Sequence, residues 1–444
     1  MIMRYIPHTS KDVEAMMKVI GVTSVNELFE AIPKSHQLTK PLDLPPSLSE
    51  MELRKQIETL AFQNEGQHYL SFLGGGCYHH YVPSIVNYLA SQGGFLTSYT
   101  PYQPEISQGT LQTTFEFQTM IARLTGMELA NASMYDGATA LAEACLMAKR
   151  LKTDKTKILI PKNLHPEYQQ VCQAYLETQD IELLAVEYDR TSGQISAMDL
   201  QSKLSSDCAA VIVQQPNFFG IVEHLKILRT MADSVNALLI VAIPEPLSLG
   251  LLKPPGEYNA DIVVGEAQSF GNPPSFGGPH VGFFATQNAY VRAIPGRIVG
   301  ETTDKKGRRC YTLTLSTREQ HIRREKATSN ICTNQALLAT RAAIYLSTVG
   351  EQGLKKLALW NHSLANILAK KLKTATLKFA SPFFNELVVE CSQPIKDIEQ
   401  NLRKNKILGG ISLEEFYPEL KNCLLICPTE IHSQEDIERL CDLL

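Results

Sequence analysis

The spacing of hydrophobic and polar positions changes near residue 70 and again near residue 330. Residues 1 to 70 show helical periodicity, and capping boxes at Ser24–Glu27 and Ser47–Glu50 predict two helix starts. From about residue 130, short runs rich in Val and Ile recur at intervals of about 20 residues. This pattern predicts buried parallel strands joined by crossover helices. The expected strands are 158–160, 183–188, 209–213, 238–242, 261–264 and 281–284.

The last part of the chain has a different pattern. A long helical region precedes two strand candidates at 386–390 and 423–427, and the capping box Ser433–Asp436 predicts a final helix. The sequence therefore predicts a helical N-terminal arm (1–70), a large α/β domain (71–330) and a small α+β C-terminal domain (331–444).

Composition excludes several classes of protein. Hydrophobic residues make up 44% and charged residues 20%, which is typical of soluble globular chains. A formal net charge of -4 indicates no nucleic-acid partner, and no apolar stretch approaches the 18 residues of a membrane span. The first ten residues lack a secretory signal, and the ten scattered cysteines form no Cys-x-x-Cys pair. We therefore expect a cytoplasmic protein with reduced cysteines and no metal site.

Two loops carry candidate chemistry in the first quarter of the chain. Residues 71–80 hold three consecutive glycines followed by His79 and His80, which could titrate near neutral pH or simply be exposed. Residues 99–112 combine two prolines with Tyr99, Tyr102 and Gln103. Such an aromatic, proline-stiffened loop favours a binding or interface role over a plain surface loop.

Three further segments have both a functional and an ordinary interpretation. The small-residue turn at 134–144 opens a helix and could present backbone N–H groups to an anion, or be an ordinary N-cap with Asp136 or Thr139. The stretch 264–280, with four glycines and three prolines after a predicted strand, could bind a ligand or be a plain connection. The charged stretch 318–334 by itself indicates a solvated helix face or a subunit interface.

Taken together, these segments resemble the P-protein family of the glycine cleavage system. The resemblance rests on residues 99–112, 266–279 and 320–334, with support from residues 5–9 and 20–29. The length of 444 residues matches the α chain of the two-chain form of this family, not the longer fused form. The resemblance implies a fold-type I pyridoxal-phosphate (PLP) architecture, as in aspartate aminotransferase, and glycine decarboxylation, an oxidoreductase activity, for the whole assembly.

The resemblance also implies a lysine that holds PLP as a Schiff base and a carboxylate that faces its pyridine nitrogen. Aligning the glycines places Gln268 at the lysine position, and no lysine occurs from residue 254 to residue 304. A glutamine amide cannot form an imine. The strand 238–246 lacks the expected aspartate and has only Glu245. We therefore expect no catalytic residue and no covalent cofactor on this chain, with PLP on a partner β chain.

The same resemblance suggests roles for the remaining motifs. Active sites of fold-type I dimers take residues from both chains, so we expect six residues to be candidates for the partner's site: Tyr99, Tyr102, Gln103, His79, His80 and Arg318. Five residues would line a vestigial cofactor pocket: Tyr135, Asp136, Gly137, Thr139 and His165.

The partners implied are the β chain, glycine, the lipoylated H-protein and, functionally, the T- and L-proteins. Two alternatives stay open at this point. The chain could be an autonomous fold-type I enzyme that uses another lysine such as Lys253 or Lys305, or it could be a regulatory binding module.

Overall fold

The computed structural model describes residues 7–331 and 335–444. Its internal contacts fall into two units that divide between Gln67 and His68. We call residues 7–67 the arm and residues 68–444 the body, and describe each by itself. The end of the 318–334 motif, from residue 332, and the first part of the 5–9 motif lie outside the described residues.

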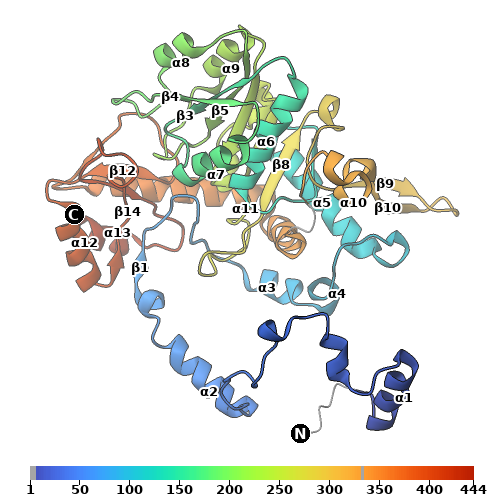
Figure 1. Ribbon diagram of the computed structural model, residues 1–444. Helices are drawn as coiled ribbons and strands as arrows, with labels where there is room; N and C mark the ends of the chain where they lie inside the picture. The colour runs from blue at the N-terminus through green and yellow to red at the C-terminus, as the bar shows by residue number, and fades with distance from the viewer. Residues whose placement is uncertain (1–6, 332–334) are drawn as a thin grey trace. The chain divides into compact units, whose positions relative to one another are not determined.

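The arm consists of two α-helices and two short 3-10 turns, and a third 3-10 turn (Glu65–His68) lies at its boundary with the body (Figure 1). Helix α1 (Ser10–Ile20) and helix α2 (Glu50–Ala61) both begin with a capping box. The second box uses Ser49 and Glu52, two residues beyond the predicted one. The predicted box at Ser24 was wrong, because the Glu27 carboxylate instead accepts the backbone N–H of Thr23 at 3.1 Å and only a 3-10 turn (Val25–Phe29) follows.

A seven-stranded sheet forms the centre of the body, in the order β2-β8-β7-β6-β5-β3-β4. Its strands are β2 (Leu129–Ala130), β3 (Lys157–Pro161), β4 (Glu182–Val186), β5 (Cys208–Gln214), β6 (Leu238–Ile243), β7 (Ile262–Glu266) and β8 (Gly282–Thr286). The pairs β4·β3, β3·β5, β5·β6 and β6·β7 are parallel. Every residue of β5, β6 and β7 is buried, as expected for strands that are covered on both faces.

Strand β8 departs from the sequence-based prediction. All six expected strands form, but β8 runs antiparallel to β7 instead of parallel. A parallel neighbour requires a crossover connection, usually a helix. The fully described segment 267–281 between the two strands contains no helix and carries three prolines and three glycines. The chain therefore returns directly beside β7. Strand β2, which has two residues, was not predicted.

Alternate residues of each strand point to two different helix layers. One face packs against α5 (Gln108–Thr125), α8 (Ala197–Lys203), α9 (Leu225–Asp233) and the start of α11 (Ala336–Lys371). The other face packs against α6 (Gly137–Leu151) and α7 (Pro166–Leu176). On β6, for example, Leu239 and Val241 face the first layer while Ile240 and Ala242 face the second. The large sheet and its helix layers thus form an α/β/α sandwich with one core on each face of the sheet.

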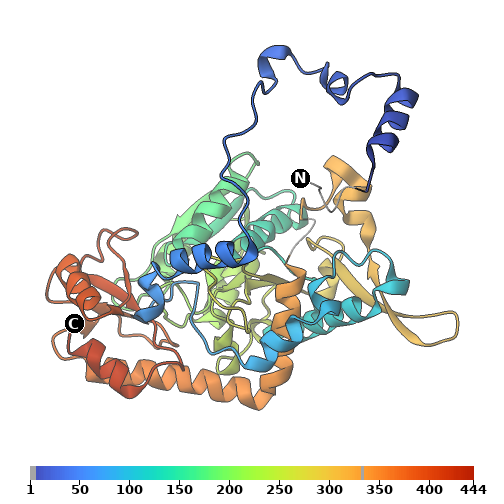
Figure 2. The ribbon, with the colours of Figure 1, turned by 90° about the horizontal axis from the view of Figure 1, so that it is seen from below.

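A small lobe follows the long helix α11. Helix α11 breaks at Gly350 (φ 60°, ψ -177°) and bends before it continues toward the lobe (Figure 2). The lobe has an antiparallel sheet of β11 (Thr376–Leu377), β12 (Leu387–Glu390), β15 (Cys423–Ile426) and β14 (Ile411–Ser412). Helices α12 (Ile395–Lys404) and α13 (Gln434–Cys441) cover it, and α13 begins with the capping box that was predicted at Ser433.

Several shorter elements complete the body. At its N-terminal end, β1 (Leu70–Ser71) pairs in parallel with β13 (Ile407–Leu408) and so belongs to the small lobe. Helices α3 (Ser84–Ala90) and α4 (Gly93–Leu96) follow. A hairpin of β9 (Ile298–Thr303) and β10 (Arg309–Thr314) protrudes from the body and leads into the short helix α10 (Gln320–Arg323) (Figure 1). Within the described ranges, no helix is long and apolar enough to cross a membrane.

Candidate functional site

Several candidate residues gather at the carboxyl edge of the large sheet. Gln268 follows the end of β7, His165 follows β3, and Gly137 begins α6. Residues 73–80, the glycine-rich loop, lie against both Gln268 and His165. The carboxyl ends of parallel strands are where α/β folds bind ligands, so this edge is the place where a cofactor site of the fold would lie.

The amide of Gln268 is buried and bonds to the glycine-rich loop. Its Oε1 accepts the backbone N–H of Tyr78 at 2.9 Å, and its Nε2 donates to the carbonyls of Tyr78 at 3.0 Å and Asn272 at 2.5 Å. A lysine can donate hydrogen bonds but cannot accept one. A lysine at this position would therefore leave the buried N–H of Tyr78 without its acceptor.

Two carboxyl groups of the chain itself occupy the N-terminus of α6. Asp136 caps the helix, with its Oδ1 accepting the N–H of Thr139 at 2.8 Å. Glu266 accepts the N–H of Gly137 at 3.1 Å and the N–H of Val281 at 2.9 Å. Burial raises the pKa of Glu266 to about 8. Two of the first-turn N–H groups that could bind an external anion, those of Gly137 and Thr139, are thus already used.

The ring of His165 is covered by the chain itself. It stacks on Tyr168 with ring centroids 4.9 Å apart and meets the edge of Phe218 at 5.0 Å. Its Nε2 lies 2.6 Å from the carbonyl oxygen of Gly75, and a Cβ on Gly76 would stand only 2.7 Å from this nitrogen. Burial lowers the pKa of His165, so the ring is neutral at physiological pH.

These contacts do not fit a bound PLP. The residue at the lysine position cannot form an imine, and the helix N-terminus that would receive a phosphate holds carboxyl groups. The imidazole on which a cofactor ring would stack is itself stacked on Tyr168 and hydrogen-bonded at its edge to the glycine-rich loop. Tyr135 is half-buried beside this pocket. We therefore derive no step through PLP on this chain.

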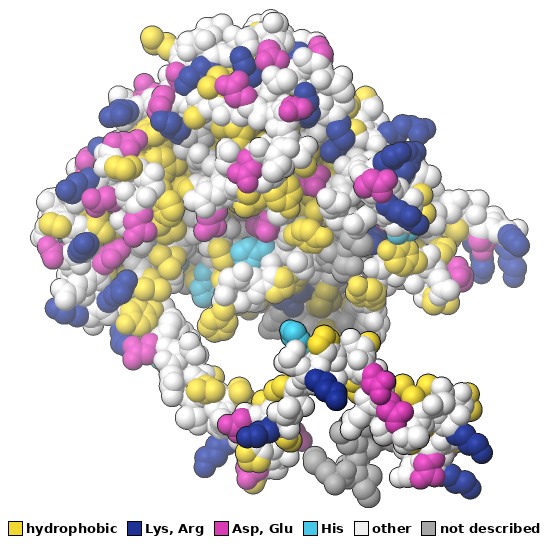
Figure 3. Space-filling model, in the orientation of Figure 1, with side chains coloured by type: hydrophobic (Ala, Val, Ile, Leu, Met, Phe, Trp, Pro, Cys, Tyr) yellow, Lys and Arg dark blue, Asp and Glu magenta, His cyan; other side chains and the backbone are white. Residues whose placement is uncertain are grey.

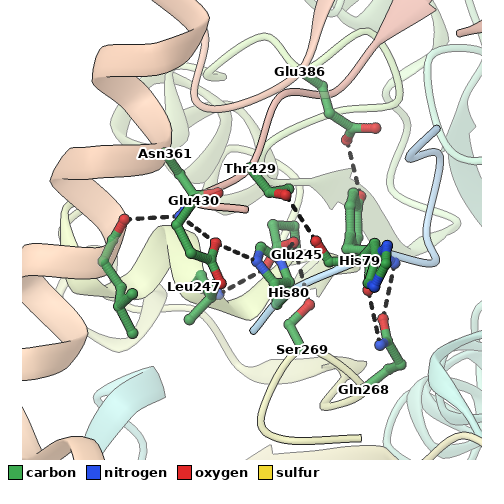
Figure 4. Close-up of polar contacts among 12 residues, drawn as sticks. His79, His80, Glu245, Leu247, Gln268, Ser269, Asn361, Glu386, Thr429 and Glu430 are labelled. Atoms are coloured by element: carbon green, nitrogen blue, oxygen red, sulfur yellow. Dashed lines mark hydrogen bonds and ion pairs between the residues drawn. The ribbon is translucent and has the colours of Figure 1, made fainter. Parts of the chain in front are cut away.

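His80 lies between two buried carboxylates (Figure 4). Its Nε2 is 2.9 Å from Oε2 of Glu245, its Nδ1 is 2.8 Å from Oε2 of Glu430, and all three side chains are at most 3% exposed. Because both ring nitrogens face acceptors, both carry a hydrogen and the ring is an imidazolium. Asn361 donates to Glu430 at 2.9 Å and Ser269 donates to Glu245 at 3.2 Å. The cluster joins the edge of the large sheet to α11 and the small lobe.

The titration of this cluster reflects its geometry. Burial alone would lower the pKa of His80, but the carboxylates of Glu245 and Glu430 outweigh it and raise the pKa to about 10. Burial would raise the pKa of Glu430, but the hydrogen bond and charge of His80 lower it to about 2. His80 and Glu430 are therefore both charged throughout the physiological range.

A third carboxyl group fixes the glycine-rich loop to the small lobe. Glu386 accepts the N–H of Gly75 at 2.7 Å and the hydroxyl of Tyr78 at 2.9 Å. Burial raises the pKa of Glu386 to about 7. The neighbouring His79 has an exposed side chain, and only its carbonyl is used, by the hydroxyl of Thr429 at 2.7 Å.

The remaining candidates lie elsewhere on the body. Tyr99 and Tyr102 are 74% and 51% exposed, and Gln103 is exposed as well. Arg318 is buried instead, and its guanidinium donates to the carbonyls of Ile294 and of Gly296, the latter at 3.2 Å. The structure thus places Arg318 inside the body and the three loop residues on its surface. Their roles toward a partner stay predictions.

Sequence reasoning missed the carboxyl groups that complete these clusters. Glu386 and Glu430 contact residues more than 300 positions away in the chain, and a single sequence contains no signal for such pairs. Glu266 lies in the 266–279 motif, but the sequence pattern indicated no role for it. Its position at the end of a fully buried strand was a usable signal, because a buried carboxyl group needs partners.

Comparisons with known proteins agree with the resemblance. The family model described as "Glycine cleavage system P-protein" matches residues 3–444. A protein of Thermotoga maritima named "Probable glycine dehydrogenase (decarboxylating) subunit 1" is 49% identical over 443 residues, which cover 99% of both chains. A crystal structure of glycine decarboxylase (P-protein) of the glycine cleavage system, in inhibitor-bound form, is 43% identical and covers 99% of each chain with a TM-score of 0.90.

A more distant likeness concerns the fold alone. Glutamate decarboxylase of Lactobacillus brevis matches with a TM-score of 0.70 and 14% identity, over 94% of this chain and 96% of that one. The predicted fold class, a fold-type I architecture with a small α+β lobe, is confirmed.

Proposed function

Since the chain belongs to the P-protein family of the glycine cleavage system, we propose that it is the PLP-free subunit 1 of a two-chain glycine decarboxylase. The observation that carries this proposal is the pocket at the carboxyl edge of the large sheet. There, Gln268 pairs with the glycine-rich loop and the carboxyl groups of Asp136 and Glu266 occupy the helix N-terminus. The family fold is kept while the cofactor position is filled by the chain itself.

The chemistry then belongs to the partner chain, which would hold PLP and bind glycine. PLP supplies an electron sink for the bond that breaks in decarboxylation. The assembly would release carbon dioxide and pass the aminomethyl group to the lipoyl arm of the H-protein, with the T- and L-proteins acting afterwards. The relatives named as subunit 1 of glycine dehydrogenase support this division. A cytoplasmic location stays a prediction from the sequence.

The exposed apolar surface of the arm supports an obligate partner chain. No residue between 7 and 67 is buried, and hydrophobic side chains are visible along the arm in Figure 3. On α2, Leu53, Ile57 and Leu60 are each about half exposed, and their spacing puts them on one helix face. An apolar stripe of this kind needs a surface to cover it.

The body adds a second apolar surface around helices α3 and α4. Large exposed side chains recur along this stretch, at Tyr81, Ile85, Tyr88, Leu96, Tyr99, Tyr102 and Ile106. Exposed patches of this extent mark interaction sites in soluble proteins. We propose that this surface and the arm both contact the subunit 2 chain, and that the loop of Tyr99, Tyr102 and Gln103 reaches the partner's active site.

No specific observation favours either alternative function, an autonomous PLP enzyme or a regulatory binding module. Lys253 forms an exposed ion pair with Glu257 at 2.9 Å, and Lys305 is exposed in the β9–β10 hairpin. Neither lysine lies at the carboxyl edge of the sheet, so an autonomous PLP enzyme has no support. No observation on this chain supports a regulatory binding module either.

Restoring the lysine alone is not expected to restore a cofactor site. In Gln268→Lys, Glu266 and Asp136 still occupy the helix N-terminus, and the N–H of Tyr78 loses its acceptor at a cost of about 1 to 3 kcal/mol. We expect the variant to be less stable and to incorporate no PLP after borohydride reduction. Gln268→Met is the matched control, because it also removes the acceptor for Tyr78 but introduces no amine. Stoichiometric labelling of the introduced lysine would contradict the conclusion that the contacts around Gln268 do not fit PLP.

The proposed function is tested by reconstitution. The chain, its subunit 2 partner and the mixture are each supplied with PLP, glycine and lipoylated H-protein, and release of carbon dioxide from glycine is measured. We expect activity from the mixture only. Activity of either chain alone at the rate of the mixture would contradict the proposal that both are required.

A further inference from the structure

Two motifs that are far apart in the sequence meet at one buried arginine. Arg297, directly before β9, is only 6% exposed. Its Nε donates to Oε2 of Glu319 at 3.2 Å, and its Nη2 donates to the hydroxyl of Tyr102 at 2.8 Å. Tyr102 belongs to the 99–112 loop and Glu319 to the charged 318–334 motif. Arg297 therefore connects the two.

The contacts around Arg297 extend to a fourth side chain. Its guanidinium carbon lies 5.2 Å from the ring centroid of Tyr102, in cation–π contact. His321 of α10 belongs to the same network, because its ring meets that of Tyr102 edge-on at 5.6 Å and its Nδ1 lies 3.5 Å from Oε2 of Glu319. Glu319 is 8% exposed, so the buried charges compensate each other within the network.

The same arginine lines a cavity of about 360 Å³ beside the loop. Tyr99, Thr100 and Pro101, the residues just before Tyr102, form part of its wall. The cavity wall is mainly apolar, with the guanidinium of Arg297 as its charged group. The position of this wall thus depends on how the loop is held, and Arg297 holds it through Tyr102.

We propose that Arg297 is a positioning residue that fixes the 99–103 loop in the conformation in which it completes the active site of the partner chain. It acts through Tyr102 and does not touch the reacting atoms. The inference rests on the proposed function. An arginine suits this role because its planar fork donates in two fixed directions, toward Glu319 and toward Tyr102. A lysine has a single nitrogen on a flexible stem and cannot keep both contacts.

A double-mutant cycle on the full-length chain, assembled with subunit 2, tests the role. We expect Arg297→Lys and Tyr102→Phe each to lower kcat for glycine decarboxylation about tenfold, the typical effect of losing a charge-assisted hydrogen bond. KM for glycine should change less than about twofold, and both variants should still assemble. Because Arg297 acts through Tyr102, the double variant should be no slower than the slower single variant.

Arg309→Lys is the matched control. Arg309 also lies over a tyrosine ring, that of Tyr311 at 5.3 Å, but it is exposed on the hairpin. Its replacement should leave kcat unchanged. The proposal is overturned if the effects of Arg297→Lys and Tyr102→Phe multiply in the double variant, if either leaves kcat unchanged, or if they act only by preventing assembly. A wild-type pair without activity would instead contradict the proposed function, and the positioning role would fall with it.

Discussion

Replacing His80 with glutamine is expected to lower the free energy of unfolding by about 3 to 5 kcal/mol, the usual cost of breaking a buried ion pair. In the wild type, the imidazolium compensates the carboxylates of Glu245 and Glu430, which are 2% and 3% exposed. Glutamine removes the charge and leaves two carboxyl groups facing each other. The loss should be visible as a lower midpoint of denaturant unfolding.

His79→Gln is the control, because the side chain of His79 is exposed and only its backbone carbonyl is bonded. Its effect should stay within about 0.5 kcal/mol, as for other surface substitutions. Equal midpoints for wild type and His80→Gln would show that the cluster of Glu245, His80 and Glu430 contributes nothing net to stability.

The same cluster predicts how stability depends on pH. The pKa of His80 is raised from its ordinary 6.5 to about 10, so the folded chain holds this proton more tightly than the unfolded chain. Its contribution is therefore fully present below pH 6.5 and is lost as the pH rises to about 10. The stability difference between wild type and His80→Gln should shrink over this range, as followed by unfolding at several pH values. A difference that grows with pH would contradict the assignment.

Introducing a charge into the apolar stripe of the arm is expected to abolish assembly with subunit 2. Ile57→Asp places a carboxylate in the stripe of Leu53, Ile57 and Leu60, which we propose is covered by the partner. A carboxylate cannot be buried in such a contact without a partner charge. We expect a loss of affinity of at least about 100-fold, a typical result of disrupting an anchor residue in an interface. The affinity is measured by titrating one chain with the other.

Thr59→Asp controls for the added charge on the same helix. Thr59 lies two residues further along α2, about 200° around the helix from Ile57, and is also exposed. It should bind the partner normally. The isolated Ile57→Asp chain should unfold like the wild type, because Ile57 is 55% exposed there. Unchanged binding of Ile57→Asp would show that the stripe does not contact subunit 2.

The fold could be predicted where the local pattern of apolar residues determines it. Strands β5, β6 and β7 are continuous apolar runs, and their residues are buried on both faces as expected. The direction of β8 could not be obtained in this way. It depends on whether the segment before it crosses the sheet, and the absence of a helix in residues 267–281 decided this. The clustered prolines and glycines of this segment were the signal available.

The candidate site was only partly predictable for the same reason. The glycine pattern placed Gln268 at the end of β7, and the structure adds the bonds that make its amide structural. Contacts such as that of His80 with Glu430, 350 positions apart, arise only when the large sheet and the small lobe pack together. The role of Arg297 has the same origin, since its partners Tyr102 and Glu319 come from different segments.

The side chains at the carboxyl edge of the large sheet would let a chain keep this fold without a cofactor, as we propose for this one. The carboxyl group of Glu266 and the amide of Gln268 supply hydrogen bonds to buried backbone N–H groups of Gly137 and Tyr78. Unpaired buried donors would be costly. Residues of the chain thus satisfy buried N–H groups at the edge of the sheet where a cofactor would otherwise lie.

The most direct test of this view is covalent mapping of the cofactor. PLP is added to the purified chain alone and to its complex with subunit 2, both are reduced with borohydride, and the labelled peptide is identified. We expect no specific label on the chain alone, and in the complex a label on a lysine of subunit 2. A stoichiometric label on one lysine of this chain would contradict the central claim, because it would mean that the chain holds the cofactor itself.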